Sequence, residues 1–591
     1  MAGYRAPLRE MRFWLGQLME QGGQPTLPAY GGFPADLVEA VLEEAAHLAE
    51  DVLDPLYRLA DREGVEFEAG EVRMPEEIKA AYRQFADAGW VGLSAPAEFG
   101  GQALPQVLAT AVNEIWKSAN LAFSLCPMLT QGAIGALARH ANSSVQRRFL
   151  PKMIAGGWTG TMNLTEPQAG SDLGALRAIA EPADDHYRLS GRKIFITWGD
   201  HDLAENIVHL VLARTPGAPD GVRGLSLFVV PKFLVDDDGR VAARNEVTTV
   251  SIEEKLGIHG SPTCVLSYGD GQGAKAWLVG EESRGLEYMF TMMNSARLAV
   301  GVEGLAMAER AYQQALAYSR ERVQGKRPLD GGPAVILEHP DVRRMLMLMK
   351  AGSDAMRALC YLAGLELDRS DGGGAEALER ASLLTPIVKG WCTETAQELA
   401  SLGVQIHGGA GYIEETGAAQ IMRDARVLTI YEGTTGIQAN DLVGRKLIRD
   451  GGAALGALLD EVGGLLPTLA AAGALLAATE SALRDGVAAA RQAVDAVLAR
   501  HADDPDLAGA VAVNLLMLMG TLLGGWQLAA GAVSAQAALK TDTGDRDWLT
   551  AKIVTAEFYA EHLMPRVHAY LAAVLAGSRT VMGLTPEQMT R

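Results

Sequence analysis

The stretch Asn163-Leu-Thr-Glu-Pro-Gln-Ala-Gly-Ser-Asp172 stands close to the point at which the 591-residue sequence changes from a helical to an extended pattern. Over residues 34–157, apolar residues recur at the spacing of an amphipathic helix. Over residues 158–282, short runs rich in β-branched residues alternate with Gly, Pro and Asp. The sequence therefore predicts an N-terminal helical domain followed by a small β-domain.

Helical periodicity returns after the β-rich region. It covers residues 285–447 and continues, beyond Asp450-Gly451-Gly452, in the Ala- and Leu-rich region 453–591. A chain of this length exceeds the size at which one hydrophobic core keeps growing, so several domains are expected. We predict an α+β fold with an N-terminal helical domain, a central β-barrel-like domain, a C-terminal helical bundle and an extra C-terminal helical domain.

One segment raises the question of a membrane. Residues 507–539 contain no charged residue and exceed the roughly 20 residues that span a bilayer. The segment is built mainly from Ala, Leu and Gly, and it contains Asn514, Gln527 and Gln536. This composition favours a helix packed inside the protein. A helix that contacts a membrane or docks a partner is the alternative.

Charge and cysteine content narrow the class of protein. The net charge is −20, so nucleic acid is not an expected partner. The four cysteines are far apart and form no CxxC pair, which predicts neither a zinc site nor a disulfide scaffold. Residues 1–12 show no apolar signal core, so we expect no secretion signal and a cytoplasmic location.

Four motifs, in order along the chain, resemble those of the acyl-CoA dehydrogenase family. They are Asn163–Asp172, Lys255-Leu-Gly-Ile258, Gln405-Ile-His-Gly-Gly-Ala-Gly-Tyr412 and Tyr431-Glu-Gly-Thr434. The resemblance implies FAD-dependent α,β-dehydrogenation of an acyl-CoA thioester to the trans-2-enoyl-CoA. Electrons would then pass to an electron-transferring flavoprotein. The N-terminus and the helical tail resemble a longer branch, which includes 3-methylmercaptopropionyl-CoA dehydrogenases and enzymes for medium or long fatty acyl-CoA.

The α-C–H of a thioester is a weak acid, so the reaction needs a carboxylate base and donors aimed at the carbonyl oxygen. The resemblance implies that Glu432 is this base. Glu432 follows the mostly apolar run 427–430, so we expect a partly desolvated carboxylate with a raised pKa. Some family members place the base at a position that aligns with Ala296, which carries no carboxylate. A capping or salt-bridged glutamate is the alternative role for Glu432.

The resemblance also implies which residues bind FAD and substrate, and it requires no metal. The implied FAD contacts are Leu164, Thr165, Ser171, Phe195, Ile196, Thr197, Arg322, Gln405, Gly408, Gly409 and Thr434, and the implied substrate contacts are Ser171, Arg297 and Gly433. Phe195 stands where the family often carries Trp. Arg322 and the Gln405 loop would reach FAD held by a neighbouring subunit, which implies a homo-oligomer and favours a dimer.

Other interpretations remain open. Residues 166–170 also fit a simple tight turn, and His201 and the run 423–426 fit structural roles. An acyl-CoA oxidase or a desulfinase would carry the same motifs. A flavin-containing stress protein that binds DNA is the non-catalytic alternative, and the net charge of −20 argues against it. The acyl chain length does not follow from these motifs.

Overall fold

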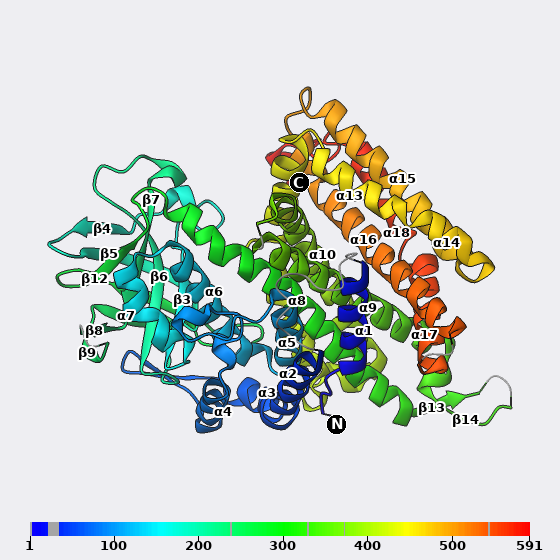
Figure 1. The fold of residues 1–591 in the computed structure, drawn as a ribbon, viewed down its shortest axis with the longest axis horizontal. Coiled ribbons are helices and arrows are strands. Elements are labelled where there is room, and N and C mark those ends of the chain that lie inside the picture. The colour runs from blue at the N-terminus through cyan, green and yellow to red at the C-terminus, as the bar shows by residue number, and fades with distance from the viewer. Residues whose placement is uncertain are drawn as a thin grey trace. The chain divides into compact units, whose positions relative to one another are not determined.

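The computed structural model describes residues 3–21, 35–236, 239–327, 330–371, 373–541 and 544–590. Residue 34, the predicted start of the first domain, lies outside them. Along the chain, the described residues are mainly helical before and after a β-rich segment (Figure 1). They fall into two compact units. Unit one comprises Met1–Leu42, Gln106–Glu114 and Val300–Arg591, and unit two comprises Glu43–Pro105 and Ile115–Ala299.

Three helices contribute to both units, namely α2 (Ala35–Leu48) and two others. The other two are α5 (Gln106–Ala119) and α8 (Gly285–Glu321). The four domains are predicted from changes in residue pattern along the chain, whereas the two units are defined by contacts between residues in space. The four-domain division therefore stays a prediction.

Unit two contains an eight-stranded sheet in the order β10-β11-β5-β12-β7-β6-β3, with β4 paired to both β5 and β6. The strands are β3 (Trp158–Asn163), β4 (Ile179–Pro182), β5 (Tyr187–Thr197), β6 (Asn206–Arg214), β7 (Leu225–Pro231), β10 (Val247–Ile252), β11 (Thr263–Tyr268) and β12 (Ala274–Val279). Unit two also contains two separate two-stranded hairpins. One pairs β1 (Glu66–Glu68) with β2 (Glu71–Arg73), and the other pairs β8 (Phe233–Val235) with β9 (Val241–Arg244). Because β4 joins strands that are not neighbours, the sheet curls on itself, which agrees with the predicted barrel-like domain.

Unit two also contains helices. They are α3 (Asp54–Glu63), α4 (Glu76–Asp87), α6 (Leu121–His140) and α7 (Ser143–Ile154), together with parts of α2 (Ala35–Leu48), α5 and α8. Of these, α6 and α7 contact β3. The strand β7 is buried along its whole length, as expected for a run in which Ser226 is the one polar residue. Helix α6 approaches β3 closely, since a Cβ at Gly160 would lie 2.6 Å from the Cβ of Ala133. Glycine at this position therefore permits the contact.

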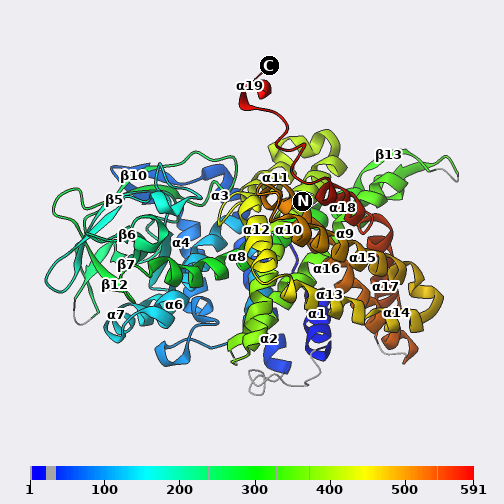
Figure 2. The same cartoon turned by 90° about the horizontal axis from the view of Figure 1, so that it is seen from above.

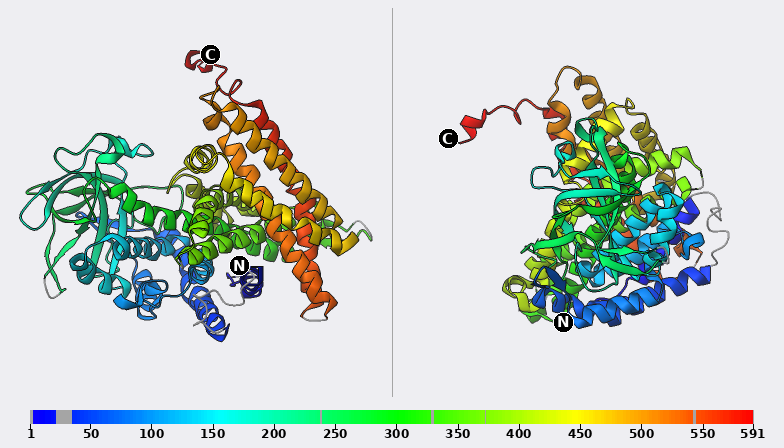
Figure 3. Two further views of the ribbon diagram at one scale, coloured as in Figure 1. Left: turned by 45° about the horizontal axis from the view of Figure 1, so that its top comes forward. Right: turned by 90° about the vertical axis from the view of Figure 1, so that its left-hand side faces the viewer.

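Unit one is helical. Besides the remaining parts of α2, α5 and α8, its helices are α1 (Leu8–Gln21), α9 (Pro340–Asp371), α10 (Ala375–His407), α11 (Ala418–Arg426), α12 (Thr435–Asn440), α13 (Ala453–Gly464), α14 (Leu466–Ala472), α15 (Ala477–Arg500), α16 (Leu507–Lys540), α17 (Arg546–His562), α18 (Arg566–Ala576) and α19 (Pro586–Met589). A hairpin of β13 (Val323–Lys326) and β14 (Pro333–Val335) follows α8. The C-terminal helices, coloured yellow to red, run side by side (Figure 3), and the chain beyond α18 leads out to α19 (Figure 2).

Helix α16 is the charge-free segment that raised the question of a membrane. It contacts α9, α10, α15, α17 and α18 within unit one. A Cβ at Gly520 would lie 2.1 Å from Cγ of Trp391, so the small residues allow α16 to approach α10. Leu121–His140, Ala453–Arg500 and Leu507–Lys540 are long and apolar enough to cross a membrane by composition. For α16, the burial confirms the prediction of a packed helix.

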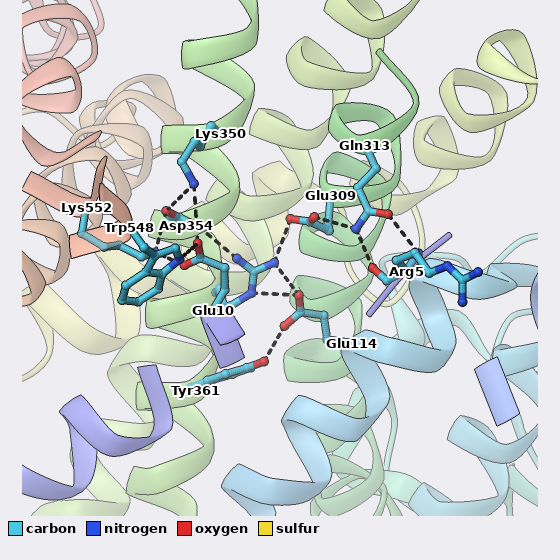
Figure 4. A network of polar contacts seen from close by, with 11 residues as sticks. Arg5, Glu10, Glu114, Glu309, Gln313, Lys350, Asp354, Tyr361, Trp548 and Lys552 are labelled. Atoms are coloured by element: carbon cyan, nitrogen blue, oxygen red, sulfur yellow. Dashed lines mark hydrogen bonds and ion pairs between the residues drawn. The ribbon is translucent and has the colours of Figure 1, made fainter. Parts of the chain in front are cut away.

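A fully buried arginine, Arg357, joins three helices of unit one. Figure 4 labels its partners Glu114, Glu309 and Asp354. From α9, Arg357 donates to Glu114 of α5 at 2.9 and 2.7 Å and to Glu309 of α8 at 2.8 Å. Arg357 also bonds Asp354 at 3.1 Å, and the Tyr361 hydroxyl donates to Glu114 at 2.6 Å. Taking such charges out of water is costly, and the pairing offsets that cost only while every partner is present.

The same network extends to α1 and α17. Lys552 of α17 donates to Asp354 at 3.0 Å and forms an ion pair with Glu10 of α1. The ammonium group also lies 5.2 to 5.3 Å from the rings of Phe13, Trp14 and Trp548. These contacts attach α1 and the C-terminal helices to α9.

Replacing Arg357 with Met should lower the free energy of unfolding by about 3–5 kcal/mol, because Glu114 and Glu309 would stay buried without their cation. Chemical denaturation followed by circular dichroism measures the change. Arg344 is the matched control, since it lies on the same helix with its side chain 48% exposed and pairs with Asp341. Arg344→Met should change the free energy by less than about 1 kcal/mol. An equal decrease in the free energy of unfolding in both variants would contradict the proposed contribution of the buried network to stability.

Candidate active site

Glu432 lies in unit one in a left-handed turn between the short helix η9 (Val427–Thr429) and α12. Its φ is 54°, and the φ of Gly433 is 92°. The glutamate side chain is half-buried. A left-handed conformation is costly for a residue with a Cβ, and such strain persists only where the surroundings hold it. The local backbone therefore holds the carboxylate in a defined place.

Two buried side chains hold the backbone of this turn. Lys389 of α10 donates from Nζ to the carbonyl oxygen of Gly433 at 2.7 Å. The side-chain amide of Gln438, on α12, donates to the carbonyl oxygens of Glu432 at 3.4 Å and Gly433 at 3.3 Å. Both side chains have a relative exposure of 0%. The sequence interpretation missed both residues, although a lysine within the largely apolar middle of α10 is a recognisable signal.

The flanks of the turn are also fixed. The hydroxyl of Tyr431 donates to the carboxylate of Glu303. Burial and the Glu303 carboxylate raise the pKa of Tyr431 well above its usual value, so the phenol stays a neutral donor. The Thr434 hydroxyl accepts a hydrogen bond from the backbone N–H of Ile437 at 3.2 Å and thereby caps α12. Thr434 therefore has a role as the N-cap of α12, besides the FAD contact that the sequence predicts.

Four of the residues predicted to contact FAD lie near the C-terminal ends of α8 and α10. Arg322 directly follows α8, while Gln405, Gly408 and Gly409 lie at or just beyond the end of α10. All four are exposed. The two helix ends are tied together, because the rings of Tyr318 and His407 stack with centroids 4.4 Å apart. A Cβ at either glycine would meet nothing within 4 Å, so the backbone there is open to approach.

In unit two, the loop that begins at Asn163 lies along β5. The Lys193 side chain donates to the carbonyl oxygen of Leu164 at 2.9 Å. The backbone N–H of Ile194 donates to the carbonyl oxygen of Thr165, also at 2.9 Å. The structure thereby brings Leu164 and Thr165 beside the end of β5, which carries Phe195, Ile196 and Thr197.

Lys193 also binds the middle of that loop. It pairs with the buried Glu166 at 2.9 Å, and Glu166 accepts from the backbone N–H groups of Arg177 at 2.7 Å and Ala178 at 3.0 Å. Residues 166 and 169 exchange two backbone hydrogen bonds, so this segment is a tight turn as well as part of the loop. Burial lowers the pKa of Lys193 to about 8. The motif placed Glu166 in the loop but did not reveal that Lys193 holds it.

A β-bulge in β5 explains the position of Phe195. Pairing with β11 runs from Lys193↔Leu266 to Ile196↔Cys264, which leaves two residues of β5 opposite one of β11. Phe195 lies in the bulge with a φ of 58° and is 59% exposed, whereas Ile196 is buried. Bulges often redirect a side chain next to a functional site. Ser171, farther along the loop, is exposed.

Arg297 belongs to unit two, whereas Glu432 and Gly433 belong to unit one. The Arg297 side chain is buried, donates to Asn294 at 3.3 Å and lies 5.8 Å from the ring of Phe290. Ala296, which aligns with the alternative base position, is also buried.

His201 has the structural role that the sequence favoured. Its Nε2 lies 2.9 Å from the Thr159 hydroxyl, and its Nδ1 accepts from the backbone N–H of Leu203 at 3.1 Å. Burial lowers the pKa of His201 to about 4, so the ring is neutral at neutral pH. In the 423–426 run, Arg423 pairs with Glu414 at 2.8 Å. Both findings agree with structural roles for these residues.

Comparison with known families covers most of the chain. The acyl-CoA dehydrogenase N-terminal, middle and C-terminal domain models match residues 35–157, 161–270 and 283–447. A fourth model, acetyl-CoA dehydrogenase C-terminal like, matches residues 458–585. This chain belongs to the acyl-CoA dehydrogenase family. It is therefore an oxidoreductase that acts on acyl-CoA.

Two curated acyl-CoA dehydrogenases match almost the full chain. The 3-methylmercaptopropionyl-CoA dehydrogenase of Ruegeria pomeroyi is 50% identical over 95% of this chain and 96% of its own length. The broad-specificity linear acyl-CoA dehydrogenase FadE5 of Mycobacterium tuberculosis is 35% identical over 96% of both chains. Among solved structures, the Bacillus anthracis acyl-CoA dehydrogenase complexed with FAD aligns with a TM-score of 0.74 at 21% identity, covering 92% of this chain and 89% of that one. This structural likeness supports the fold.

Acyl-CoA dehydrogenases depend on FAD, and the residues present fit this cofactor. In unit two, the exposed ring of Phe195 offers an apolar face suited to stacking on a flat heteroaromatic ring. The half-buried Thr165 adds a hydroxyl that both donates and accepts hydrogen bonds. In unit one, the Arg322 cation and the open backbone at Gly408 and Gly409 suit a pyrophosphate group.

Gly433→Ala should reduce acyl-CoA dehydrogenase activity at least about tenfold, because small displacements of reacting groups carry large rate penalties. The added Cβ would lie 2.5 Å from Nε2 of Gln438, at a φ of 92° that side chains rarely adopt. Steady-state assays with an artificial electron acceptor, normalised to FAD content, measure the effect. Gly436→Ala is the control, since the nearest atom to its Cβ would be 3.7 Å away. Unchanged activity in Gly433→Ala would show that the turn tolerates rearrangement.

Proposed function

We propose that Glu432 removes the α-proton of an acyl-CoA thioester during its dehydrogenation to the trans-2-enoyl-CoA. The observation that carries this role is the strained turn in which the half-buried carboxylate lies within the Tyr431-Glu-Gly-Thr434 motif. Strained backbone conformations are concentrated at active sites, where they fix reacting groups in advance. The fixed turn supports a base whose position is set before substrate binds.

The proton leaves the α-carbon as negative charge develops on the thioester oxygen, so that oxygen needs a hydrogen-bond donor. We assign this donor role to the backbone N–H of Glu432, with Gly433 and Arg297 also contributing to the substrate site. A donor of this kind contributes about 3 kcal/mol to catalysis. Bound FAD supplies the hydride acceptor for the β-carbon. The residues of the chain position the thioester and exclude water around the carboxylate.

The remaining FAD contacts form part of the same proposal. Phe195 and the residues around it are assigned to the flavin ring, with Thr165 hydrogen-bonding to N5 or O4, and Ser171 is assigned to both cofactor and substrate. Arg322 and Gln405, with the neighbouring glycines, are assigned to FAD bound by a second subunit, because all are exposed. We further propose that the protein is a homodimer, that it passes electrons to an electron-transferring flavoprotein and that it is cytoplasmic.

For the substrate, we propose a short acyl chain that carries a thioether, as in 3-methylmercaptopropionyl-CoA. The support is the 50% identity to the Ruegeria enzyme over 95% of this chain, compared with 35% to the enzyme for linear acyl-CoA. Both relatives have nearly the same coverage. The difference in identity therefore favours the thioether substrate over straight chains.

Anaerobic bleaching of the enzyme-bound flavin tests the substrate assignment. We expect 3-methylmercaptopropionyl-CoA to reduce the flavin with at least about tenfold higher kcat/KM than hexadecanoyl-CoA, a difference of about 1.4 kcal/mol in transition-state binding. Butyryl-CoA and octanoyl-CoA serve as straight-chain comparisons. A clear preference for long chains would reject the thioether proposal. Rapid hydrogen peroxide formation in air would identify an oxidase instead.

Glu432→Gln tests the base, because the amide keeps the size of the side chain and removes its basicity. Flavin reduction at saturating acyl-CoA should fall by about 10²–10⁴-fold, while FAD content and acyl-CoA binding change little. Stopped-flow absorbance measures reduction, and a thermal melt reports folding. A folded, FAD-loaded variant that reacts at the normal rate would remove Glu432 from the mechanism. Loss of folding or of FAD would support a structural role.

A further inference from the structure

A lysine in the middle of α10 lies directly behind the Glu432 turn. Lys389 has a relative exposure of 0%, and its Nζ donates to the carbonyl oxygen of Gly433 at 2.7 Å. Helix α10 contacts both α12 and η9, which flank the turn. The lysine therefore reaches the turn from a helix that supports it on both sides.

The chemistry of this contact goes beyond packing. Burying an ammonium group is costly, and a charge-assisted hydrogen bond to a backbone carbonyl is roughly twice as strong as a neutral one. Cys392 and Thr393, one turn along α10, are both buried, so Lys389 points into a dry region. An apolar side chain would fill such a position at lower cost. The contact with the turn gives the charge a role that an apolar residue does not supply.

The carbonyl that accepts this bond controls the conformation of the turn. Glu432 and Gly433 both have positive φ, at 54° and 92°. Holding the Gly433 carbonyl fixes the peptide plane that follows the strained Glu432 and the left-handed Gly433. Gln438 bonds the same oxygen at 3.3 Å. Removing the Lys389 bond would let the strain relax. The carboxylate of Glu432 would then leave its place.

We infer that Lys389 is a positioning residue for the α-proton abstraction step, which it supports by locking the left-handed turn that presents Glu432. The inference rests on the proposed role of Glu432 as the base. Lys389 acts through the backbone and does not touch the reacting atoms. Its loss should lower the rate of the chemical step more than the affinity for acyl-CoA.

The test is stopped-flow flavin reduction in Lys389→Met, a variant that keeps most of the length of the side chain and removes its charge and its hydrogen-bond donor. At saturating 3-methylmercaptopropionyl-CoA, or butyryl-CoA if that thioester is not a substrate, we expect kcat to fall by about 10- to 100-fold. KM should change by less than about threefold, because binding and chemistry separate in such a case. FAD content should match the parent enzyme.

Lys552→Met is the matched control. Lys552 is a second buried lysine of unit one, but its partners are Asp354 and Glu10 rather than the turn. We expect this variant to melt at a lower temperature and to keep the parent rate of flavin reduction per bound FAD. Lys389→Gln, which retains a shorter neutral donor, is the second test variant and should fall between parent and Lys389→Met.

The outcomes separate the inference from the proposed function. A normal kcat in FAD-loaded Lys389→Met, beside an inactive Glu432→Gln, overturns the inference and leaves the base in place. A raised KM with unchanged kcat also overturns it. Normal reduction by Glu432→Gln overturns the proposed function itself. If both Lys389 variants fail to fold or to bind FAD, Lys389 is needed for the packing around α10, and the positioning role is rejected.

Discussion

Unit one depends on a guanidinium group that has no access to water. Arg357 connects α9 to α5 and α8 through two carboxylates on different helices, Glu114 and Glu309. Its neighbour Asp354 extends the connection to Lys552 and, through that lysine, to α1. Helices from the beginning, middle and end of the chain therefore meet around one set of charges. Because Glu114, Glu309 and Asp354 are buried, the geometry of the bundle and the pairing of these charges depend on each other.

Two of the four motif segments, 163–172 and 431–434, are held by the same kind of contact. In unit two, Lys193 donates to the carbonyl oxygen of Leu164, and in unit one, Lys389 donates to that of Gly433. Each contact combines a buried ammonium group with a backbone carbonyl, which leaves the motif side chains available. Residues with positive φ, Phe195 and Glu432, lie close to these contacts. Buried charge thus lies close to strained backbone in one motif, at Glu432, and beside another, at Phe195.

Much of the architecture was readable from the sequence, because helical and extended segments differ in the period of their apolar residues. The charge-free helix α16 was also interpreted correctly, since its glycines and alanines fit a close helix contact. The compact units were not predictable in this way, because α8 passes from one to the other without a break in its pattern.

For the candidate site, the motifs directed attention to Glu432, Phe195 and the glycines beyond α10. They did not reveal the bulge that exposes Phe195, because a bulge depends on the register of the partner strand β11. Nor did they reveal that Lys193 and Gln438 donate to backbone carbonyl oxygens of these motifs. Backbone acceptors leave no mark on the sequence, so the supporting contacts required the structure.

The contact between Gly520 and Trp391 has a consequence for how the enzyme is assembled from its parts. Trp391 lies two residues after Lys389 on α10, is 2% exposed, and is covered by α16. A chain that ended after Gly452 would present this indole and the facing side of α10 to water. Such an uncovered apolar surface promotes aggregation. The C-terminal extension is therefore a structural part of unit one, because α16 covers an apolar face of α10.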